Sequence, residues 1–306
     1  MILPVLFAGL VEFTEVVSSV NSGPNSEDRI STSGFGLKMG SEYDFAVFRD
    51  LLETFLSLPL SGNLIVIFIL YVFDKLAAPR RARWFALHGF ANMLVVVTAF
   101  NGTITSLRDP LYSLDSRIYR DKSLLGCASP WPVYIINALH VYHLLFFDVK
   151  GQELFHHLVF VPVIGFMGQY FDWGAAQGFM AFFISGLPGA IDYLLLVLVK
   201  YNKIDTITQK RVCAALNVYV RGPFIIISAH TIYLAMLYGN LTVPKWACTS
   251  ILIIALFNSL YYTKQSVANW AVSSVVASFV EMTGMELPNL KEIGAKISAK
   301  TQTTVS

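Results

Sequence analysis

The sequence predicts an all-α fold, a multi-pass transmembrane helix bundle with about seven spans. Three observations lead to this class. The 306-residue chain is 55% hydrophobic and only 14% charged, which is more apolar than an ordinary soluble domain. Its apolar residues gather in runs of about 20, the length that an α-helix needs to cross a bilayer. Lysine and arginine concentrate in alternate loops between these runs, as the positive-inside rule expects.

Residues 1–50 are predicted to be an N-terminal lead-in with one short apolar segment. The run 1-MILPVLFAGLV-11 is too short to span a bilayer, and Glu12 and Glu15 follow it. No basic residue precedes the run, so it makes a poor signal peptide. We expect it to be interfacial or re-entrant. Residues 18–43 are rich in serine, glycine, asparagine and acidic residues, which favours a polar lead-in.

Residues 51–265 are predicted to form the transmembrane domain, with interruptions in three of its spans. The interruptions are Pro59 with Gly62–Asn63 in the first span, 185-SGLPG-189 in the fifth and 221-RGP-223 in the sixth. Residues 266–306 are predicted to form an amphipathic helix and a cytosolic tail, and the helix, at 265–282, would lie on the membrane or on the bundle. The seven spans are expected at about 53–73, 84–101, 130–147, 154–171, 175–199, 211–238 and 245–262.

Two independent signals give the same orientation of the spans. Loop 74–83, region 200–211 and the C-terminal tail each carry four lysines or arginines. The opposite set, which is the N-terminal lead-in and loops 102–129, 172–174 and 239–245, carries about eight in all, four of them in the longer loop 102–129. We therefore expect the C-terminus in the cytosol and the N-terminus in the lumen. Two N-x-[ST] sequons, at Asn101 and Asn240, both fall on the lumenal side of this arrangement.

Ionisable residues from several spans are predicted to share the cytosolic half of the membrane. Because a helix rises about 1.5 Å per residue, their depths follow from their positions along each span. Ionisable groups at membrane depth are costly unless they pair or reach water. Their gathering in one half predicts a polar cavity that opens to the cytosol. The residues are His88, His140, His143, Asp148, His156, His157, Asp192 and Arg221.

Four of these residues are predicted to be catalytic: His156, His157, Asp192 and Asp148. Asp192 would orient one imidazole of the adjacent histidine pair and fix its tautomer, which leaves the other ring nitrogen as a general base. Asp148 and the histidine pair flank one tight loop. The simpler interpretation of Asp148 is a solvated loop end beside Lys150.

The other four residues are predicted to bind substrate or lipid. His140 and His143 lie three apart on one helix face, and the alternative is that they form ordinary interhelical hydrogen bonds. Arg221 would hold a polar group, or would only cap carbonyls freed by the break at Gly222–Pro223. His88 lies about one turn inside its span, where an interfacial position without a specific role is the alternative.

Several classes of partner and cofactor are excluded. The net charge of +2 argues against a nucleic-acid partner. The three cysteines have no CxxC spacing, so they do not indicate a zinc knuckle. Six histidines are too few for the boxes of membrane di-iron oxygenases, and adjacent histidines on a helix point about 100° apart. We therefore predict no metal site and no required cofactor; the alternative is a three-histidine zinc site of the membrane-hydrolase kind, for which the number of histidines suffices.

Three stretches of the chain carry related motifs: 143-HLLFFDVKGQELFHHLVF-160, 182-FFISGLPGAIDYLLLVLVKYNK-203 and 217-NVYVRGPFIIISAH-230. They contain an Asp-Val-Lys before the His-His pair, a later Asp-Tyr-Leu-Leu, and an Arg followed by Pro. With these motifs the chain resembles the TLC-domain family, which includes the ceramide synthases. Two departures argue against N-acyl transfer: Gly189 stands where ceramide synthases carry a second acid, and the threonine that often follows the His pair is missing. The chain looks closer to the smaller TLC-domain proteins, in which the second span carries a histidine, here His88, and a loop rich in Asp-Pro follows, here 108-RDPLYSLD-115.

This resemblance spans about residues 50–265 and implies both a fold and a function. Roughly six helices would ring a cavity that admits an acyl chain. The implied role is to bind, sense or regulate membrane lipids in the endoplasmic reticulum, with a long-chain base, fatty acyl chain or ceramide as partner. The alternative is a ceramide-synthase-like N-acyltransferase. A histidine base would then help a long-chain base to attack acyl-CoA, which would be the co-substrate.

Overall fold

The computed structural model describes residues 59–148, 161–239 and 241–284. Contacts divide the chain into two units, residues 1–50 and 51–306, and every described residue belongs to the second. The predicted lead-in, the histidine pair at 156–157 and the tail beyond residue 284 lie outside the described residues. The described helices and their contacts therefore all belong to one unit of the chain.

The described residues form α-helices, one short 3-10 helix and three π-helical segments, with no β-strand among them, which confirms the predicted all-α class. In chain order they are α3 (Pro59–Leu76), the 3-10 helix η1 (Arg80–Ala82), α4 (Arg83–Arg108), α5 (Trp131–Phe146), the π segment η2 (Val161–Phe166), α7 (Met167–Tyr170), α8 (Ala176–Ala181), the π segment η3 (Phe182–Gly186), α9 (Leu187–Lys200), α10 (Thr206–Leu216), the π segment η4 (Asn217–Arg221), α11 (Gly222–Tyr238) and α12 (Lys245–Thr283).

Two of the predicted interruptions are π-helical turns inside continuous helices. Segment η3 joins α8 to α9 in one helix, Ala176–Lys200, and η4 joins α10 to α11 in another, Thr206–Tyr238. Pro188 and Pro223 each follow directly in the first two residues of the next helix. Proline has no N–H to donate and clashes with the carbonyl four residues earlier. A widened turn before each proline lets the helix continue.

Four helices among the described residues are long and apolar enough to cross a membrane, fewer than the seven spans predicted. Helix α5 has 16 residues, about 24 Å, which is short of the usual spanning length. The predicted spans 53–73 and 154–171 both begin outside the described residues. The four are Arg80–Arg108, Ala176–Lys200, Thr206–Tyr238 and Lys245–Thr283, and they indicate an integral, multi-pass membrane protein.

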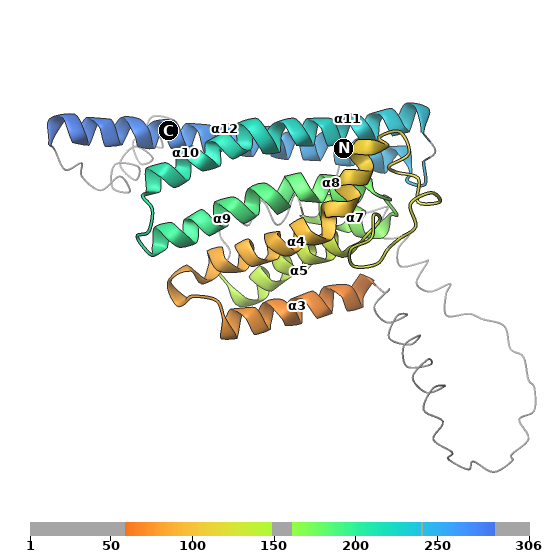
Figure 1. The fold of residues 1–306 in the computed structure, drawn as a ribbon, viewed down its shortest axis with the longest axis horizontal. Helices are drawn as coiled ribbons and strands as arrows, with labels where there is room; N and C mark the ends of the chain where they lie inside the picture. Colours follow the sequence, from red (N-terminus) through yellow and green to blue (C-terminus); the bar gives the residue numbers. More distant parts are fainter. Residues whose placement is uncertain (1–58, 149–160, 240, 285–306) are drawn as a thin grey trace, which may run out of the picture. The chain divides into compact units, whose positions relative to one another are not determined.

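Helix α12 corrects the prediction of a separate amphipathic helix at 265–282. It runs without a break from Lys245 to Thr283, 39 residues or about 59 Å, because no proline or glycine interrupts that stretch. Gly284 ends it in the left-handed conformation that caps many helices. In Figure 1 the helix continues past α11 and lies along α10, which it contacts.

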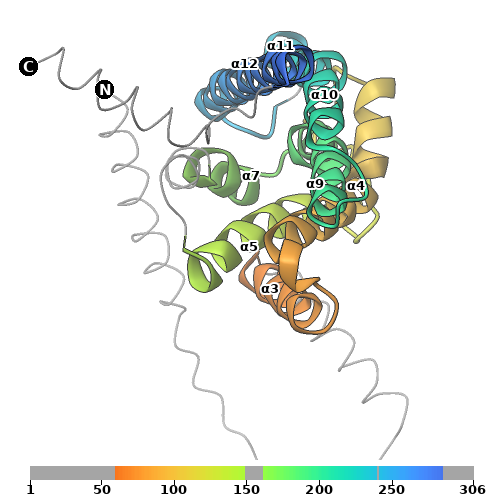
Figure 2. The same cartoon turned by 90° about the vertical axis from the view of Figure 1, so that its left-hand side faces the viewer.

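Among the described residues, six helical members form a closed ring, as the family resemblance implied. Figure 2 views the members along the helices, and each contacts the next around the ring. Helix α3 lies outside the ring and packs on α4 and α5. The members are, in order, α4, α5, η2 with α7, α12, α10–η4–α11 and α8–η3–α9.

Glycines bring α4 and α8 close together and so position the wall of this ring. A Cβ atom built on Gly102 would lie 2.8 Å from the carbonyl oxygen of Cys127 and 3.2 Å from the Cα atom of Gly178. Neither neighbour is a side-chain atom that is able to move aside. Small residues such as Gly178 in the fifth predicted span therefore allow a close helix approach.

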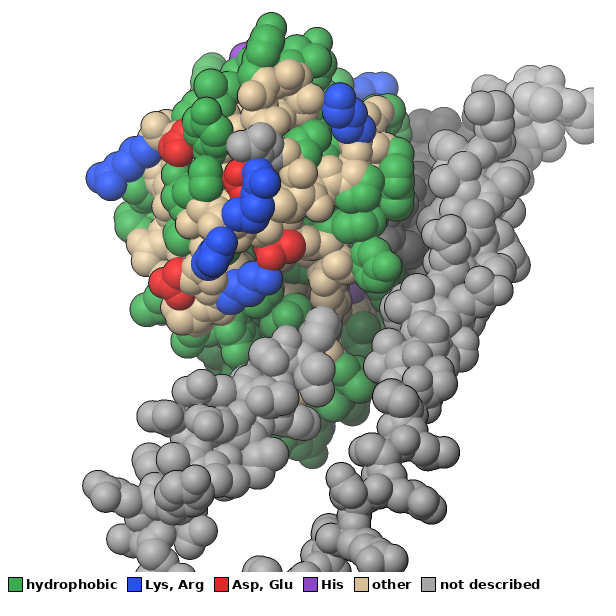
Figure 3. Space-filling model, turned by 90° about the vertical axis from the view of Figure 1, so that its right-hand side faces the viewer, with side chains coloured by type: hydrophobic (Ala, Val, Ile, Leu, Met, Phe, Trp, Pro, Cys, Tyr) green, Lys and Arg blue, Asp and Glu red, His purple; other side chains and the backbone are tan. Residues whose placement is uncertain are grey.

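The loops that the sequence placed on the lumenal side meet at one end of the bundle. Thr242 donates a hydrogen bond to the Leu114 carbonyl (2.9 Å) and one to that of Asp172 (3.2 Å). Lys122 pairs with Asp172 at 2.6 Å. Figure 3 shows charged side chains gathered on this face. The grouping of these loops agrees with the alternating arrangement of spans.

The loop between α4 and α5 is held by its own polar contacts. Arg117 binds Asp115 through two nitrogens, at 2.9 and 2.8 Å, and this bond lowers the pKa of the Asp115 carboxyl. Tyr119 donates to Asp109 at 2.7 Å, and burial together with this bond raises the pKa of Tyr119 to about 12. The loop is therefore a defined cap on the bundle.

Candidate functional site

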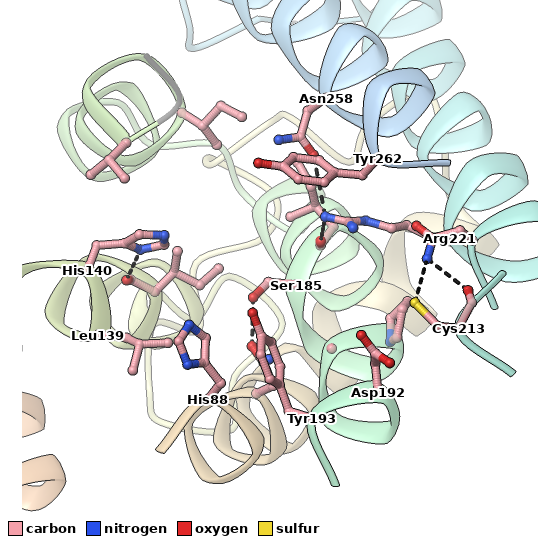
Figure 4. A pocket seen from close by; sticks show the side chains of 18 of the residues that line it. His88, Leu139, His140, Ser185, Asp192, Tyr193, Cys213, Arg221, Asn258 and Tyr262 are labelled. Atoms are coloured by element: carbon pink, nitrogen blue, oxygen red, sulfur yellow. Dashed lines mark hydrogen bonds between the residues drawn. The ribbon is translucent and has the colours of Figure 1, made fainter. Parts of the chain in front are cut away.

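The ring encloses a pocket of about 370 Å³, within the range of small-molecule sites. Polar side chains make up much of its wall, although the bundle around it is apolar. Figure 4 shows His88 and His140 on one side and Arg221, Asn258 and Tyr262 on the other. Every member of the ring contributes to the lining. The polar lining residues are His88, Asn92, Asn137, His140, Ser185, Asp192, Tyr193, Cys213, Asn217, Arg221, Asn258, Tyr262, Gln265 and Ser266.

All three π-helical segments of the described chain contribute to this wall. Segment η2 supplies Ile164 and Gly165, η3 supplies Ser185, and η4 supplies Asn217 and Arg221. A π turn rotates the following side chains relative to an α-helix and is often found at functional sites. The geometry of the pocket thus depends on local irregularities in three different helices.

Of the residues singled out from sequence, His88, His140, Asp192 and Arg221 line the pocket. His143 does not: it is fully buried behind the wall. Asp148 is exposed just after the end of α5 and is absent from the lining. The other two, His156 and His157, lie outside the described residues.

Stacked rings fix the positions of His88 and His143. The His143 ring stacks on Trp84 and on His88, with centroids 4.1 and 4.3 Å apart. Tyr193 in turn stacks on His88, with the ring centroids 4.2 Å apart. Such ring contacts are worth about 0.5–1.5 kcal/mol beyond the area they bury. In the described structure His143 therefore packs against these rings, and the interhelical hydrogen bond of the alternative interpretation stays a prediction.

The two pocket histidines are held in one tautomer by backbone carbonyls. Nδ1 of His88 lies 2.9 Å from the Trp84 carbonyl, and Nδ1 of His140 lies 2.6 Å from that of Ile136. A carbonyl oxygen only accepts, so we assign the proton of each neutral ring to Nδ1. The lone pair is then on Nε2, which is the arrangement that an acceptor or a base requires.

Asp192 is anchored by α10. Its Oδ1 accepts a hydrogen bond from Nε2 of Gln209 at 2.6 Å, and the thiol of Cys213 also bonds to the carboxylate. Both partners come from the helix that follows the α9–α10 loop. The predicted pairing of Asp192 with the adjacent histidines involves residues outside the described part of the chain, so it stays a prediction.

Arg221 extends from η4 toward α8–η3–α9 and α12. Its Nη2 donates to the carbonyl of Ile184 at 2.5 Å. Pro188 lies four residues after Ile184 and has no N–H for that oxygen, so the arginine replaces a missing helical donor. This bond caps a carbonyl of a neighbouring helix, whereas the predicted capping concerned the break at Gly222–Pro223 and stays a prediction. Nη2 also lies 3.4 Å from Asn258, and the Tyr262 ring covers the guanidinium at 5.5 Å.

Three buried polar atoms on pocket residues have no hydrogen-bond partner among the described residues. They are Oδ1 of Asn137, Oδ1 of Asn217 and Nε of Arg221. Leaving a buried polar atom unsatisfied costs about 1–3 kcal/mol. Such atoms in native proteins usually bond to ordered water or to a ligand. The pocket is therefore suited to polar contents.

The sequence reasoning missed the amide and hydroxyl groups of the wall. It followed ionisable residues only, whereas asparagines and serines contribute from α4, α5, η4 and α12. A signal was present in α12, where Asn258, Tyr262 and Ser266 follow one another at intervals of four and share one face. Polar residues at helical spacing inside an apolar span are a usable sign of a cavity wall.

No protein-family model matches this chain, and no curated protein or solved structure matches it. The resemblance to the TLC-domain family therefore stays a prediction from the quoted motifs.

Proposed function

We propose that this protein binds a membrane lipid, in a sensing or regulatory role, with the polar end of the lipid in the pocket. The observation that carries the proposal is a pocket of about 370 Å³ inside a ring of apolar helices, with a wall that combines polar side chains with apolar surface. A membrane lipid has both characters that such a site needs, because it joins a polar group to apolar chains. The unsatisfied atoms of Asn137, Asn217 and Arg221 offer two acceptors and a donor to the polar group.

A packing contact at Gly189 favours binding over ceramide-synthase-type chemistry. If the chain is a TLC-domain protein, Gly189 stands where the ceramide synthases carry a second acid. A Cβ atom there would overlap Nδ2 of Asn92. Asn92 is buried and accepts a hydrogen bond from Ser185 at 2.7 Å. An acidic side chain at residue 189 would need this pair to rearrange.

N-acyl transfer from acyl-CoA to a long-chain base is the second candidate. His88 and His140 favour it, because both rings line the pocket with Nδ1 on a carbonyl. A general base in this tautomer takes a proton at Nε2, and its removal typically costs 10²- to 10⁴-fold in rate. His156 or His157, oriented by Asp192, would be the base in the mechanism that the sequence predicts. Residence in the endoplasmic reticulum is part of both proposals.

One experiment separates the two candidates. The full-length protein is purified in mild detergent, and its lipids are extracted and identified by mass spectrometry. A second portion is incubated with a long-chain base and acyl-CoA. We expect a co-purified lipid and no N-acylated product. Product that disappears in His156→Ala and His157→Ala would instead establish the acyltransferase.

A matched pair of variants shows whether any lipid occupies the pocket. Ile136→Trp adds bulk to the pocket wall, and Ile253→Trp makes the same change at a site that is 62% exposed on the outside of α12. We expect the first variant to lose the co-purified lipid and the second to retain it. Equal lipid content in both would place the lipid on the outer surface and refute the proposal.

A further inference from the structure

Arg221 brings a positive charge to the pocket and forms no ion pair with a carboxylate among the described residues. The ion pairs of that part of the chain are Arg83–Asp74, Arg117–Asp115 and Lys122–Asp172. Asp192 is the other charged residue of the wall, and it attracts Arg221 electrostatically without direct contact. The Asp192 carboxylate is instead hydrogen-bonded by α10, through Gln209 and Cys213.

The groups around Arg221 bind the guanidinium without cancelling its charge. They are a carbonyl of Ile184, an amide oxygen of Asn258 and the ring of Tyr262. Nε has no hydrogen-bond partner within the described chain. An arginine at membrane depth is costly unless an opposite charge or water meets it. Guanidinium groups bind phosphate and carboxylate with good geometry, since planar donors face paired oxygens.

A polar seam, formed by Cys213, Gln265 and Ser266, lies between the pocket that contains Arg221 and a second cavity. The second cavity, of about 510 Å³, lies between α10 and α12. It shares Cys213, Gln265 and Ser266 with the first pocket, so the two cavities lie side by side, with these residues between them. The shared residues are neutral and polar, which suits the passage of a polar group between the two helices.

Lys210 stands at the other end of the seam. Its Nζ donates to Oδ1 of Asn269 (2.9 Å) and to Oγ of Ser273 (2.6 Å), both on α12. It too lacks a carboxylate partner within the described ranges. Lys210 precedes Arg221 by 11 residues, about 16 Å along the helix. Arg221 and Lys210, neither of which forms an ion pair within the described residues, thus lie along one polar tract.

We propose that this tract takes an amphiphile whose polar end carries an anionic group, a phosphate or a carboxylate, and that Arg221 binds the anion. The inference rests on the proposed lipid-binding function and narrows its ligand class. Lys210 attracts the same group at the outer end of the seam. The apolar chain of the amphiphile lies among the apolar residues of the pocket and bundle.

The test compares three amphiphiles with one chain: hexadecyl phosphate, palmitate and hexadecanol. Their equilibrium binding to the full-length protein is measured in uncharged detergent at low and high salt. We expect at least one anionic probe to bind roughly tenfold or more tightly than hexadecanol, as charge-assisted hydrogen bonds require. Inorganic phosphate is added as a competitor. Displacement would assign the site to free phosphate as well, and retention would show that the chain is needed; both agree with an anion site.

Three variants connect this preference to the seam. Arg221→Gln is expected to abolish the preference for the anionic probe and to leave hexadecanol affinity within about twofold. Because Arg221 also donates a hydrogen bond to the Ile184 carbonyl, its substitution could prevent folding. Lys210→Gln therefore provides a second, independent test of the preference for the anionic probe. We expect Lys210→Gln to weaken the anionic probe about threefold, an effect that salt suppresses. Arg211→Gln, at the exposed neighbouring position, is the control and should change nothing.

The outcomes distinguish this inference from the function on which it rests. Equal affinity for hexadecanol and both anionic probes would overturn the anion site and leave lipid binding intact. An equal loss of affinity for the anionic probe in Lys210→Gln and Arg211→Gln would overturn the role of the seam. The general positive charge of the surface would then explain the loss. Failure of all three probes to bind the unaltered protein would refute lipid binding itself.

Discussion

Substituting Gly102 with alanine tests whether the α4–α8 contact sets the position of the pocket wall. Helix α4 carries His88 and Asn92, and it meets α8 through Gly102 and Gly178. A methyl group at residue 102 would lie 2.8 to 3.2 Å from backbone atoms, closer than ordinary van der Waals contact. The backbone of one helix must then move.

The magnitude depends on two opposing terms, and a second glycine on α4 isolates one of them. Alanine in a helix gains about 0.5–1 kcal/mol over glycine. Overpacking costs about 1–3 kcal/mol. Gly89 lies on the same helix, and the atoms nearest to its added Cβ are 3.8 Å away. Gly89→Ala should therefore show the gain alone, and the two variants should differ by about 1–3 kcal/mol.

The assay is thermal unfolding of the purified variants in one detergent. For a unit of this size, 1 kcal/mol corresponds to about 2–4 °C in Tm. We expect Gly102→Ala to melt about 2–12 °C below Gly89→Ala. Lipid content, measured on the same samples, should fall in Gly102→Ala alone. Equal Tm values would refute the claim that the close helix approach at Gly102 is required.

Three further predictions concern the rest of the bundle. The carboxylate of Asp74 is buried and accepts bonds from Arg83 and from Tyr142 (2.7 Å), so Asp74→Ala should cost about 2–3 kcal/mol and Tyr142→Phe about 1 kcal/mol in thermal unfolding. Because Arg117 lowers the pKa of Asp115 below its usual 3.8, the stabilisation is present above that pH and is lost as the pH falls through the lowered value. Asp115→Asn should therefore lower Tm at pH 7, and this deficit should shrink as the pH falls below 3.8; a deficit that does not change with pH would exclude the carboxylate. Finally, a C-terminal tag should be reached by antibody when the plasma membrane alone is permeabilised, and an N-terminal tag should not. The reverse pattern would overturn the predicted orientation.

Depth arithmetic along each predicted span was sufficient to bring His88, His140, Asp192 and Arg221 to one pocket. It works because a helix advances by a fixed rise per residue, so residues at similar depth on neighbouring helices lie close together. Depth does not give rotation. His143 is only one turn from His140 on the same helix. Its ring nevertheless stacks on Trp84 and His88 and does not line the pocket.

The helix irregularities were only half predictable. Proline at residues 188 and 223 identified where the regular hydrogen bonds fail. The sequence could not show that each helix continues through a π turn, because the response depends on packing against neighbouring helices. The same limit applies to α12, where a span at 245–262 and a separate amphipathic helix at 265–282 were predicted. The backbone had no breaker there, so the helix continued.

Native mass spectrometry of the purified full-length protein tests the central claim most directly, because it counts bound lipid for each chain. We predict one bound lipid in the unaltered protein and in the Ile253→Trp control, and none in Ile136→Trp. An unaltered protein without bound lipid, or an Ile136→Trp variant that still carries one, would contradict lipid binding in the pocket.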